Sequence, residues 1–414
     1  MRRRLVYGGA GTLIVALIAA GAYVLHVRQA GRDIRGSSTE QFVTTIAPPV
    51  ITGPGVVWPA YGFDASRRRV AVGITLRPPF RQAWLFHAQT LVEFPPVVAY
   101  GRLYFATNSG MVFAINATTG LRAWAHQTDR CQAASPAVAD ATVYVAFLNP
   151  RPCNASGGKG HIVAYWAGSG DVRWSRPIGP SETSPVVVGD SVYVGDWDGY
   201  VYAFSARTGR LWWKFKSDGK VKGGVAVVGG RVYFGTYGSS VYAVSATTGK
   251  EIWRSSAQQR LGSAGHFYAT PAVAYGRVYV GATDGKVYSF GADTGDLIWS
   301  HYTGGYVYSS SAVWHDLVLT GSYSGRFSAY DAATGDTRWT FDADGRISGS
   351  PTVVAGIVYF ATLKGTTYGL DALTGKQVWT FPDGKYSPVV ADTHRVYLTG
   401  YGRIYGLEPS HPVG

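Results

Sequence analysis

The chain has 414 residues, of which 46% are hydrophobic and 14% are aromatic, so a large core can form and a disordered protein is excluded. Its 54 glycines and 20 prolines follow no collagen-like period, and only 15% of the residues are charged, which favours many tight turns between strands over long surface helices. The net charge of +13 favours an anionic neighbour, such as a phosphate-rich polymer, lipid head groups or an acidic protein.

An uncharged segment follows the basic N-terminus. The sequence MRRR precedes Leu5–Val24, and about twenty apolar residues at ~1.5 Å per residue would cross the hydrocarbon core of a bilayer. We therefore expect a transmembrane anchor over residues 1–28, with the N-terminus in the cytoplasm and the rest of a single-pass membrane protein outside it. A cleaved signal peptide ending near Ala20–Ala22 is the alternative and would give a secreted protein. Nucleic acid is not an expected partner on either interpretation.

Tryptophan recurs with a period near forty through most of the chain. The separations between consecutive positions are 40, 50, 39, 40, 46, 40 and 40 residues, and a turn glycine lies four residues before seven of the eight tryptophans. A repeat of this length with strand-like content predicts a β-propeller, in which each repeat is one small sheet. The tryptophans expected to dock one sheet on the next are Trp84, Trp124, Trp174, Trp213, Trp253, Trp299, Trp339 and Trp379.

Each repeat predicts four strands, as in the stretch from Ser184 to Trp213, where three apolar runs separated by Gly/Asp turns precede the tryptophan strand. The series opens with a tryptophan strand at Trp84 and finishes with a third strand at Arg403–Leu407, so neither end is a complete blade. We expect these two ends to pair and to close an all-β propeller of eight blades.

The turn before each tryptophan carries a motif. Ala329–Trp339 and Gly369–Trp379 follow A-x-D-x-x-T-G-x-x-x-W most closely, and this pattern resembles the tryptophan-docking motif of the pyrroloquinoline quinone (PQQ) repeat family. The resemblance covers residues 84–408 and implies a structural motif, in which the polar side chain and the glycine fix the turn while the tryptophan packs on the next blade. Residues 29–57 are expected to form a linker, residues 58–83 an extension packed along the last blades, and residues 409–414 a tail.

The resemblance implies two alternative functions, because the same family includes PQQ-dependent quinoprotein dehydrogenases and non-enzymatic propellers similar to BamB. The dehydrogenases hold PQQ and calcium beside a disulfide between adjacent cysteines, and this sequence has no adjacent cysteine pair. The two carboxylates in Asp196–Gly199 fit an Asp-Gly hairpin turn better than a calcium loop. We therefore expect no catalytic residue, no metal site and no cofactor, and keep a dehydrogenase with PQQ and calcium as the alternative.

The only two cysteines are Cys131 and Cys153. An even pair in a chain expected to be exported favours a disulfide over two free thiols. Both cysteines fall in loops of the second blade, one before its inner strand and one between its second and third strands. A propeller places these two kinds of loop on the same face, so we expect the bond to hold down the longest insertion.

Other long loops fall on this face, which we call the loop-rich face. Insertions on one side of a repeat scaffold commonly build its binding surface. Basic and aromatic side chains there predict the capture of a protein or an anionic cell-envelope component, with a polysaccharide-binding or sensing module as a further alternative. The candidate binding residues are Lys214, Lys216, Lys220, Lys222, His266, Tyr268, Tyr306, Tyr308, Arg346, Lys385 and Tyr386.

Overall fold

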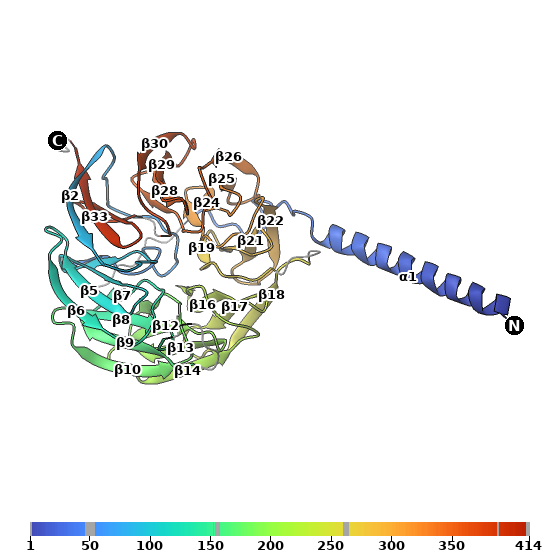
Figure 1. Ribbon diagram of the computed structural model, residues 1–414, viewed down its shortest axis with the longest axis horizontal. Helices are drawn as coiled ribbons and strands as arrows, with labels where there is room; N and C mark the ends of the chain where they lie inside the picture. Colours follow the sequence, from blue (N-terminus) through green and yellow to red (C-terminus); the bar gives the residue numbers. More distant parts are fainter. Residues whose placement is uncertain are drawn as a thin grey trace.

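The computed structural model describes residues 2–45, 54–151, 153, 158–259, 265–386 and 389–410. In this part of the chain, eight sheets surround a central axis as the blades of a propeller, and the chain passes round the ring from blade to blade (Figure 1). The predicted all-β propeller of eight blades is confirmed.

Each blade is an antiparallel sheet whose first strand lies nearest the axis, beside the first strands of the neighbouring blades. Blade one contains β3 (Val97–Ala99), β4 (Arg102–Ala106), β5 (Met111–Asn116) and β6 (Arg122–Gln127), with β1 (Val56–Trp58) added beside β3. Blades two and three contain β7 (Ala137–Ala139), β8 (Thr142–Phe147), β9 (Gly160–Trp166), β10 (Val172–Ile178), and β11 (Val186–Val188), β12 (Ser191–Gly195), β13 (Tyr200–Ser205), β14 (Leu211–Lys216). Blades four and five contain β15 (Ala226–Val228), β16 (Arg231–Gly235), β17 (Ser240–Ser245), β18 (Glu251–Ser256), and β19 (Ala272–Ala274), β20 (Arg277–Gly281), β21 (Lys286–Gly291), β22 (Leu297–Tyr302). Blades six and seven contain β23 (Ala312–Trp314), β24 (Leu317–Gly321), β25 (Arg326–Asp331), β26 (Thr337–Asp342), and β27 (Thr352–Val354), β28 (Ile357–Ala361), β29 (Thr367–Asp371), β30 (Gln377–Phe381).

Blade eight joins the two ends of the propeller. It contains β31 (Val390–Ala391), β32 (Val396–Thr399) and β33 (Arg403–Pro409), and its fourth strand is β2 (Phe80–His87). β2 pairs antiparallel with β33, with Trp84 opposite Gly406, so the predicted closure is confirmed. Because this blade has no turn between its third and fourth strands, Trp379 of blade seven instead packs edge-on against Phe80, with ring centroids 5.6 Å apart.

The outer tryptophans are held by the neighbouring blade. Trp299 is fully buried and donates from Nε1 to the carbonyl of Ala332 at 3.0 Å, and the hydroxyl of Tyr279 reaches the same carbonyl at 3.1 Å. A Cβ on Gly335, where φ is +76°, would lie 2.8 Å from the Trp299 ring, so the turn requires glycine. The same bond to a carbonyl of the next blade is made by Trp84, Trp124, Trp174, Trp213, Trp253 and Trp339.

Residues 59–71, which we call the plug, lie along the inner strands around the axis. Inner-strand amides of five blades donate to plug carbonyls, which satisfies backbone groups that would otherwise face an empty channel. The plug therefore contacts five blades, whereas the sequence predicted that the segment 58–83 packs along the last blades. The bonds, 2.7 to 2.9 Å long, are Val138 to Pro59, Val227 to Ala65, Val273 to Ser66, Val313 to Arg68 and Val353 to Arg69.

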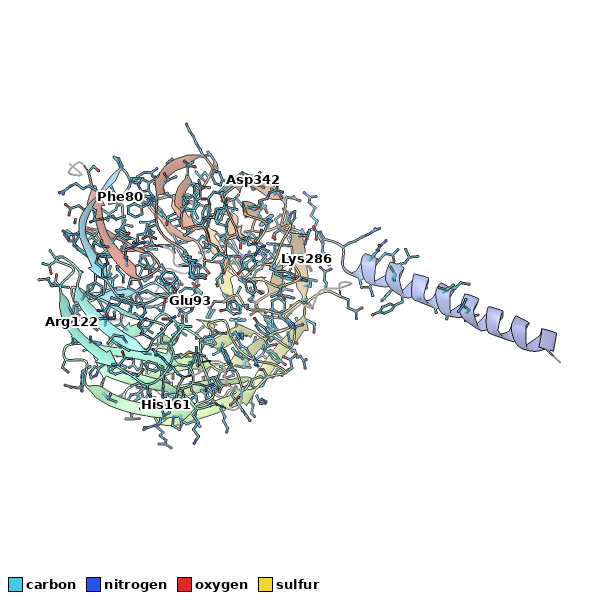
Figure 2. All side chains as sticks on the ribbon, in the orientation of Figure 1. Phe80, Glu93, Arg122, His161, Lys286 and Asp342 are labelled. Carbon is cyan, nitrogen blue, oxygen red and sulfur yellow. A yellow bond between two sulfur atoms is a disulfide. The ribbon has the colours of Figure 1, made fainter. Side chains whose placement is uncertain are left out.

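Residues 31–43, which we call the strap, lie in the segment expected to be a linker and are bound to blades five and six. The Ile34 amide donates to the carbonyl of Ser300 at 3.1 Å, and the Val43 amide donates to that of Tyr275 at 3.0 Å. The ammonium of Lys286, only 2% exposed, lies 3.0 Å from the Asp33 carboxylate. Figure 2 shows Lys286 on the side of the ring from which the N-terminal helix leaves.

Replacing Asp33 with Asn is expected to lower the free energy of unfolding by about 2 kcal/mol, because it leaves the buried Lys286 ammonium without its opposite charge. Trypsin should then cut the strap at Arg32 or Arg35 faster than in the parent chain. Asp342→Asn is the matched control, since Asp342 is 77% exposed and its ion pair with Arg326 contributes little. Equal loss of stability in the two variants, by urea titration, would contradict the role of the strap.

One helix, α1 (Arg2–Ala30), precedes the strap and points away from the ring (Figure 1). Among the described residues, no helix combines the length and apolar character needed to cross a membrane. The structure therefore corrects the transmembrane anchor predicted over residues 1–28, and the single-pass membrane location that depended on it is unsupported. Glycine and alanine make up much of this segment, and their small side chains carry little apolar surface.

Candidate functional site

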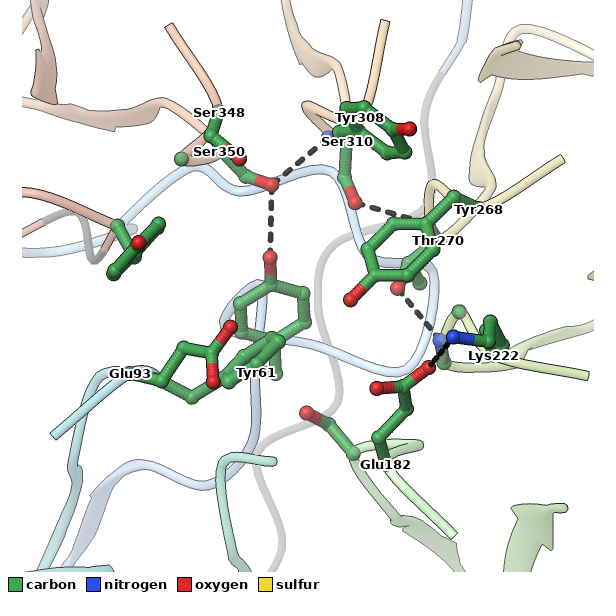
Figure 3. A pocket seen from close by; sticks show the side chains of 16 residues that line it. Tyr61, Glu93, Glu182, Lys222, Tyr268, Thr270, Tyr308, Ser310, Ser348 and Ser350 are labelled. Carbon is green, nitrogen blue, oxygen red and sulfur yellow. Dashed lines mark hydrogen bonds and ion pairs between the residues drawn. The ribbon is translucent and has the colours of Figure 1, made fainter. Parts of the chain in front are cut away.

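A pocket of about 50 Å³ opens at the axis on the loop-rich face. Its walls come from the connections that enter the inner strands of seven blades, and its floor is Tyr61 of the plug (Figure 3). The residues that line this axial pocket are Tyr61, Glu93, Phe94, Glu182, Ser184, Lys222, Gly223, Gly224, Tyr268, Thr270, Tyr308, Ser310, Ser348, Gly349, Ser350 and Tyr386.

The mouth of the axial pocket is built from one repeat position. In every blade this position lies four residues before the inner strand, so the eight-fold arrangement brings its side chains together around the axis. Of the eight residues at this position, all but Ala133 line the pocket. Their side chains differ in charge and size from blade to blade. The set is Glu93, Ala133, Glu182, Lys222, Tyr268, Tyr308, Ser348 and Tyr386.

A second tier lies two residues further along the chain, where five of the eight blades carry a hydroxyl side chain: Ser135, Ser184, Thr270, Ser310 and Ser350. Ser350 Oγ accepts from the amide of Ser310 at 2.8 Å, and Ser310 Oγ accepts from the amide of Thr270 at 2.9 Å. The Tyr61 hydroxyl lies 2.8 Å from Ser350 Oγ, within hydrogen-bonding distance. These bonds link neighbouring blades below the mouth and fix Tyr61 as the floor.

Two carboxylates face one ammonium in the axial pocket. Lys222 Nζ lies 3.0 Å from Glu182 Oε1, and both side chains are largely buried. Burial and the neighbouring charge of Glu182 raise the pKa of Glu93 to about 7, against a weaker opposing effect of Lys222. Figure 2 places Glu93 near the centre of the ring, far inside His161 and Arg122. Two carboxylates and one ammonium thus line the pocket itself, inside the basic side chains that the sequence predicts around its mouth.

Aromatic rings surround the Lys222 ammonium. Its Nζ lies 4.6 Å from the ring centroid of Trp197, 5.1 Å from that of Tyr237 and 5.7 Å from that of Tyr268. Such contacts with ring faces attract a cation through the ring quadrupole. Together with Glu182, these rings form a complete site for an ammonium group, which the chain fills with its own lysine.

The predicted binding residues divide into three groups. Lys222, Tyr268, Tyr308 and Tyr386 line the axial pocket. Around them lie Lys220 over Trp197, His266 stacked on Tyr237, Tyr306 beside Tyr308, Arg346 near Tyr323, and Lys385 near Tyr386. Lys214 and Lys216 lie on β14 beside Tyr200, at the outer edge of their blade and away from the pocket.

Tyr61, Glu93 and Glu182 were not predicted from the sequence, and neither was a row of aromatic side chains between the second and third strands. The two glutamates could have been found by aligning the repeats on the inner strand, because they occupy the same position as Lys222, Tyr268 and Tyr308. The aromatic row shares one place in the repeat, just after the second strand, and consists of Trp197, Tyr237, Tyr323 and Tyr401.

Two sequence predictions outside the pocket hold in the structure. Cys131 and Cys153 form a disulfide with Cα atoms 5.5 Å apart, as predicted. Asp196 is fully buried and serves the hairpin, accepting from the amides of Tyr200 at 2.8 Å and Gly179 at 2.9 Å.

Within the described residues no group of three or more His, Cys, Asp or Glu side chains is arranged to hold a metal ion.

Glu93 should make stability depend on pH. Its carboxyl pKa is about 7, above the ordinary value of 4.5, so the folded chain keeps a proton that the unfolded chain releases. Its contribution to stability therefore falls as the pH rises from about 4.5 to about 7. We expect Glu93→Gln to be more stable than the parent at pH 8 by about 3 kcal/mol, with no difference at pH 4.

Urea titrations at several pH values measure this difference, with Glu251→Gln, an exposed residue on β18, as the matched control. A Glu93→Gln curve parallel to that of the parent at every pH would contradict the raised pKa of Glu93.

Comparison with known proteins places this chain in a family. Residues 61–196, 151–214, 197–314 and 304–411 match the family described as outer membrane protein assembly factor BamB, a family of PQQ-like repeats. The chain belongs to this BamB family. No curated protein matches the chain itself.

Solved structures show how widely the BamB-family fold is shared. BamB from Moraxella catarrhalis is 18% identical, with a TM-score of 0.65, and the match covers 81% of this chain and all of that one. A europium-containing methanol dehydrogenase is 14% identical with a TM-score of 0.69, covering 86% and 98% of the two chains. A quinohemoprotein alcohol dehydrogenase from Comamonas testosteroni is 15% identical with a TM-score of 0.69, covering 85% and 80%. At these identities the likeness concerns the fold alone.

The axial pocket of this BamB-family chain does not fit PQQ. PQQ is a fused tricyclic quinone with three carboxyl groups, whereas the pocket measures about 50 Å³ and sites for such ligands measure roughly 300 Å³ or more. Glu93 and Glu182 would also repel its carboxylates, and Tyr61 of the plug closes the channel below.

Proposed function

We propose that this chain is an extracytoplasmic, non-catalytic binding module that holds a protein partner of the cell envelope on its loop-rich face. The observation that carries the proposal is the mouth of the axial pocket, where one repeat position presents charged and aromatic side chains to solvent while the plug occupies the axis behind them. A repeat scaffold that varies one position around a shared centre makes a recognition surface.

The rim of the loop-rich face supports a partner with acidic groups around its contact area. Arg346 is exposed, Lys220 and Lys385 lie beside the aromatic row, and the whole chain carries a net charge of +13. Complementary charges of this kind steer association and make it sensitive to salt. Membership in a family described as an assembly factor also favours a protein partner over a small substrate.

Two measurements on the full chain test this function. Cross-linking in the native cell envelope, followed by mass spectrometry, should identify a protein joined to residues of the loop-rich face. Titration with PQQ and calcium should give no stoichiometric binding and no dye-linked oxidation of alcohols or sugars. Tight PQQ binding with oxidation would replace the proposal with a dehydrogenase, and cross-links only to envelope polysaccharide would replace it with a glycan-binding module.

A further inference from the structure

The plug carries an excess of positive charge into the axis of the ring. Its stretch DASRRR contains three arginines and one aspartate. Both carboxylate oxygens of Asp64 are already bound, because Arg68 Nη2 lies 3.0 Å from Oδ2 and Ser66 donates to Oδ1 at 2.6 Å. The other two arginines, Arg67 and Arg69, are fully buried and form no ion pair with a described residue. Buried charges in folded proteins are normally paired, so this pair of arginines needs an explanation.

The two buried arginines differ in how their N–H groups are satisfied. Arg67 donates to backbone carbonyls from each of its three guanidinium nitrogens. Arg69 donates from Nε to the carbonyl of Pro351 at 2.8 Å, but its Nη1 and Nη2 atoms have no acceptor among the described residues. Buried donors of this kind are costly, and in native proteins they are met by water or by an ion.

The Arg69 guanidinium lies between Tyr61 and the backbone of Arg67. Its Cζ lies 4.0 Å from the centroid of the Tyr61 ring, and a ring face replaces only part of the hydration that a cation loses on burial. Gly62 lets Nη1 approach closely, since a Cβ there would lie 3.2 Å from Nη1 and 3.3 Å from Arg67 Cα. Two like charges therefore lie near each other where solvent does not screen them.

The charges of these groups are unfavourable where they lie. Burial lowers the pKa of Arg69, an effect that Tyr61 opposes, and the charge of Arg69 adds to burial in lowering the pKa of Arg67. The nearest carboxylate, that of Asp64, opposes this effect on Arg67 more weakly than Tyr61 does. A negative charge beside Arg69 would stabilise both guanidinium groups.

Burial and charge together restrict what can meet Nη1 and Nη2. No side of Arg69 is open to solvent, so an occupant is enclosed with the plug and must be about as small as a water molecule. A water molecule accepts hydrogen bonds but leaves the positive charge in place. A halide ion is of similar size, accepts from both nitrogens and brings the missing negative charge.

We infer that the plug binds one halide ion on Nη1 and Nη2 of Arg69, beside Arg67. The ion is a structural group that offsets the repulsion between the two arginines. Because Tyr61 lies over Arg69 and is also the floor of the axial pocket, the ion holds that floor in place. The site lies below the loop-rich face and does not depend on which partner that face binds.

Urea titration of the full chain at several chloride concentrations tests this inference. Sodium gluconate replaces sodium chloride at constant ionic strength, because gluconate is too large for an enclosed site. A ligand that binds only the folded chain raises the folding constant in proportion to its concentration once the site is saturated, so a tenfold rise in chloride should raise that constant about tenfold. A folding constant that does not change with chloride would overturn the inference.

Arg69→Met removes the donors of the site, so its folding constant should be the same at every chloride concentration. Arg207→Met is the matched control, since Arg207 is 74% exposed, and it should keep the full response of the parent. Equal chloride responses in these two variants would assign the effect to surface charges and overturn the inference.

Diffraction with bromide gives a readout that needs no substitution and decides the matter even if Arg69→Met does not fold. The full chain is refolded and crystallised in sodium bromide, and data are collected at the bromine absorption edge. We expect an anomalous peak within hydrogen-bonding distance of Nη1 and Nη2 of Arg69. A water molecule at that position, with bromide found only on the surface, would contradict the proposed site.

Discussion

Replacing Trp299 with Ala should lower the free energy of unfolding by about 4 kcal/mol, as measured by urea titration of the full chain. The indole is fully buried between blades five and six, and its Nε1 donates to Ala332 at 3.0 Å. The substitution leaves a cavity beside Tyr279 and Gly335 that the rigid turn of the next blade cannot fill. The Ala332 carbonyl still accepts from Tyr279 and Arg277 in the variant, so the cavity rather than an unsatisfied carbonyl accounts for most of the cost.

Trp212→Ala is the matched control, because it removes the same side chain from an outer strand. Trp212 lies next to the docking residue Trp213 on β14 but points outward and is 46% exposed. We expect it to cost less than about 1 kcal/mol. Equal losses at Trp299 and Trp212 would show that the tryptophan-to-carbonyl contact does not hold the blades together.

Arg67→Met should also be costly, at about 4 kcal/mol, because it removes the polar anchor of the plug. The Arg67 guanidinium is fully buried and donates to the carbonyls of Val225 and Ser184 at 2.8 Å, and to that of Pro185 at 3.1 Å. Burial and the charge of nearby Arg69 lower the pKa of Arg67 to about 9, because a positive charge is unfavourable at this buried position. Methionine removes the unfavourable charge but leaves these buried carbonyls without the Arg67 donor.

Arg207→Met serves as the control, since Arg207 is 74% exposed in a turn of blade three. It should change stability by less than about 0.5 kcal/mol. Limited proteolysis gives a second readout, because release of the plug should expose Arg68 and Arg69 to trypsin. An Arg67→Met chain as stable and as resistant as the control would show that the plug is not held by this side chain.

The blades and their closure could be predicted because the relevant signals are local and repeated. Seven of the eight docking tryptophans follow a turn glycine, and the incomplete units at Trp84 and Arg403–Leu407 indicate which ends must pair. The plug and strap could not be predicted in this way, since their bonds join residues such as Arg67 and Val225 that lie far apart in sequence. No period marks either segment.

The two glutamates of the candidate site could not be predicted from neighbours along the chain, which do not show which side chains meet at the axis. Lys214 and Lys216 lie on β14, whereas Lys222 follows that strand in the connection to blade four and lines the pocket. Glu93 and Glu182 come from blades one and three and meet only in the ring.

Photo-cross-linking from the two faces tests the central claim, that the loop-rich face binds a protein partner. Benzoylphenylalanine would replace Arg346, exposed at the mouth, in one full-length variant, and Leu373 in another. Leu373 is 59% exposed in the turn between β29 and β30, on the opposite face. Illumination of cell envelopes should give a discrete protein adduct from position 346 and none from position 373. An adduct from position 373 alone, or equal adducts from both, would contradict the account.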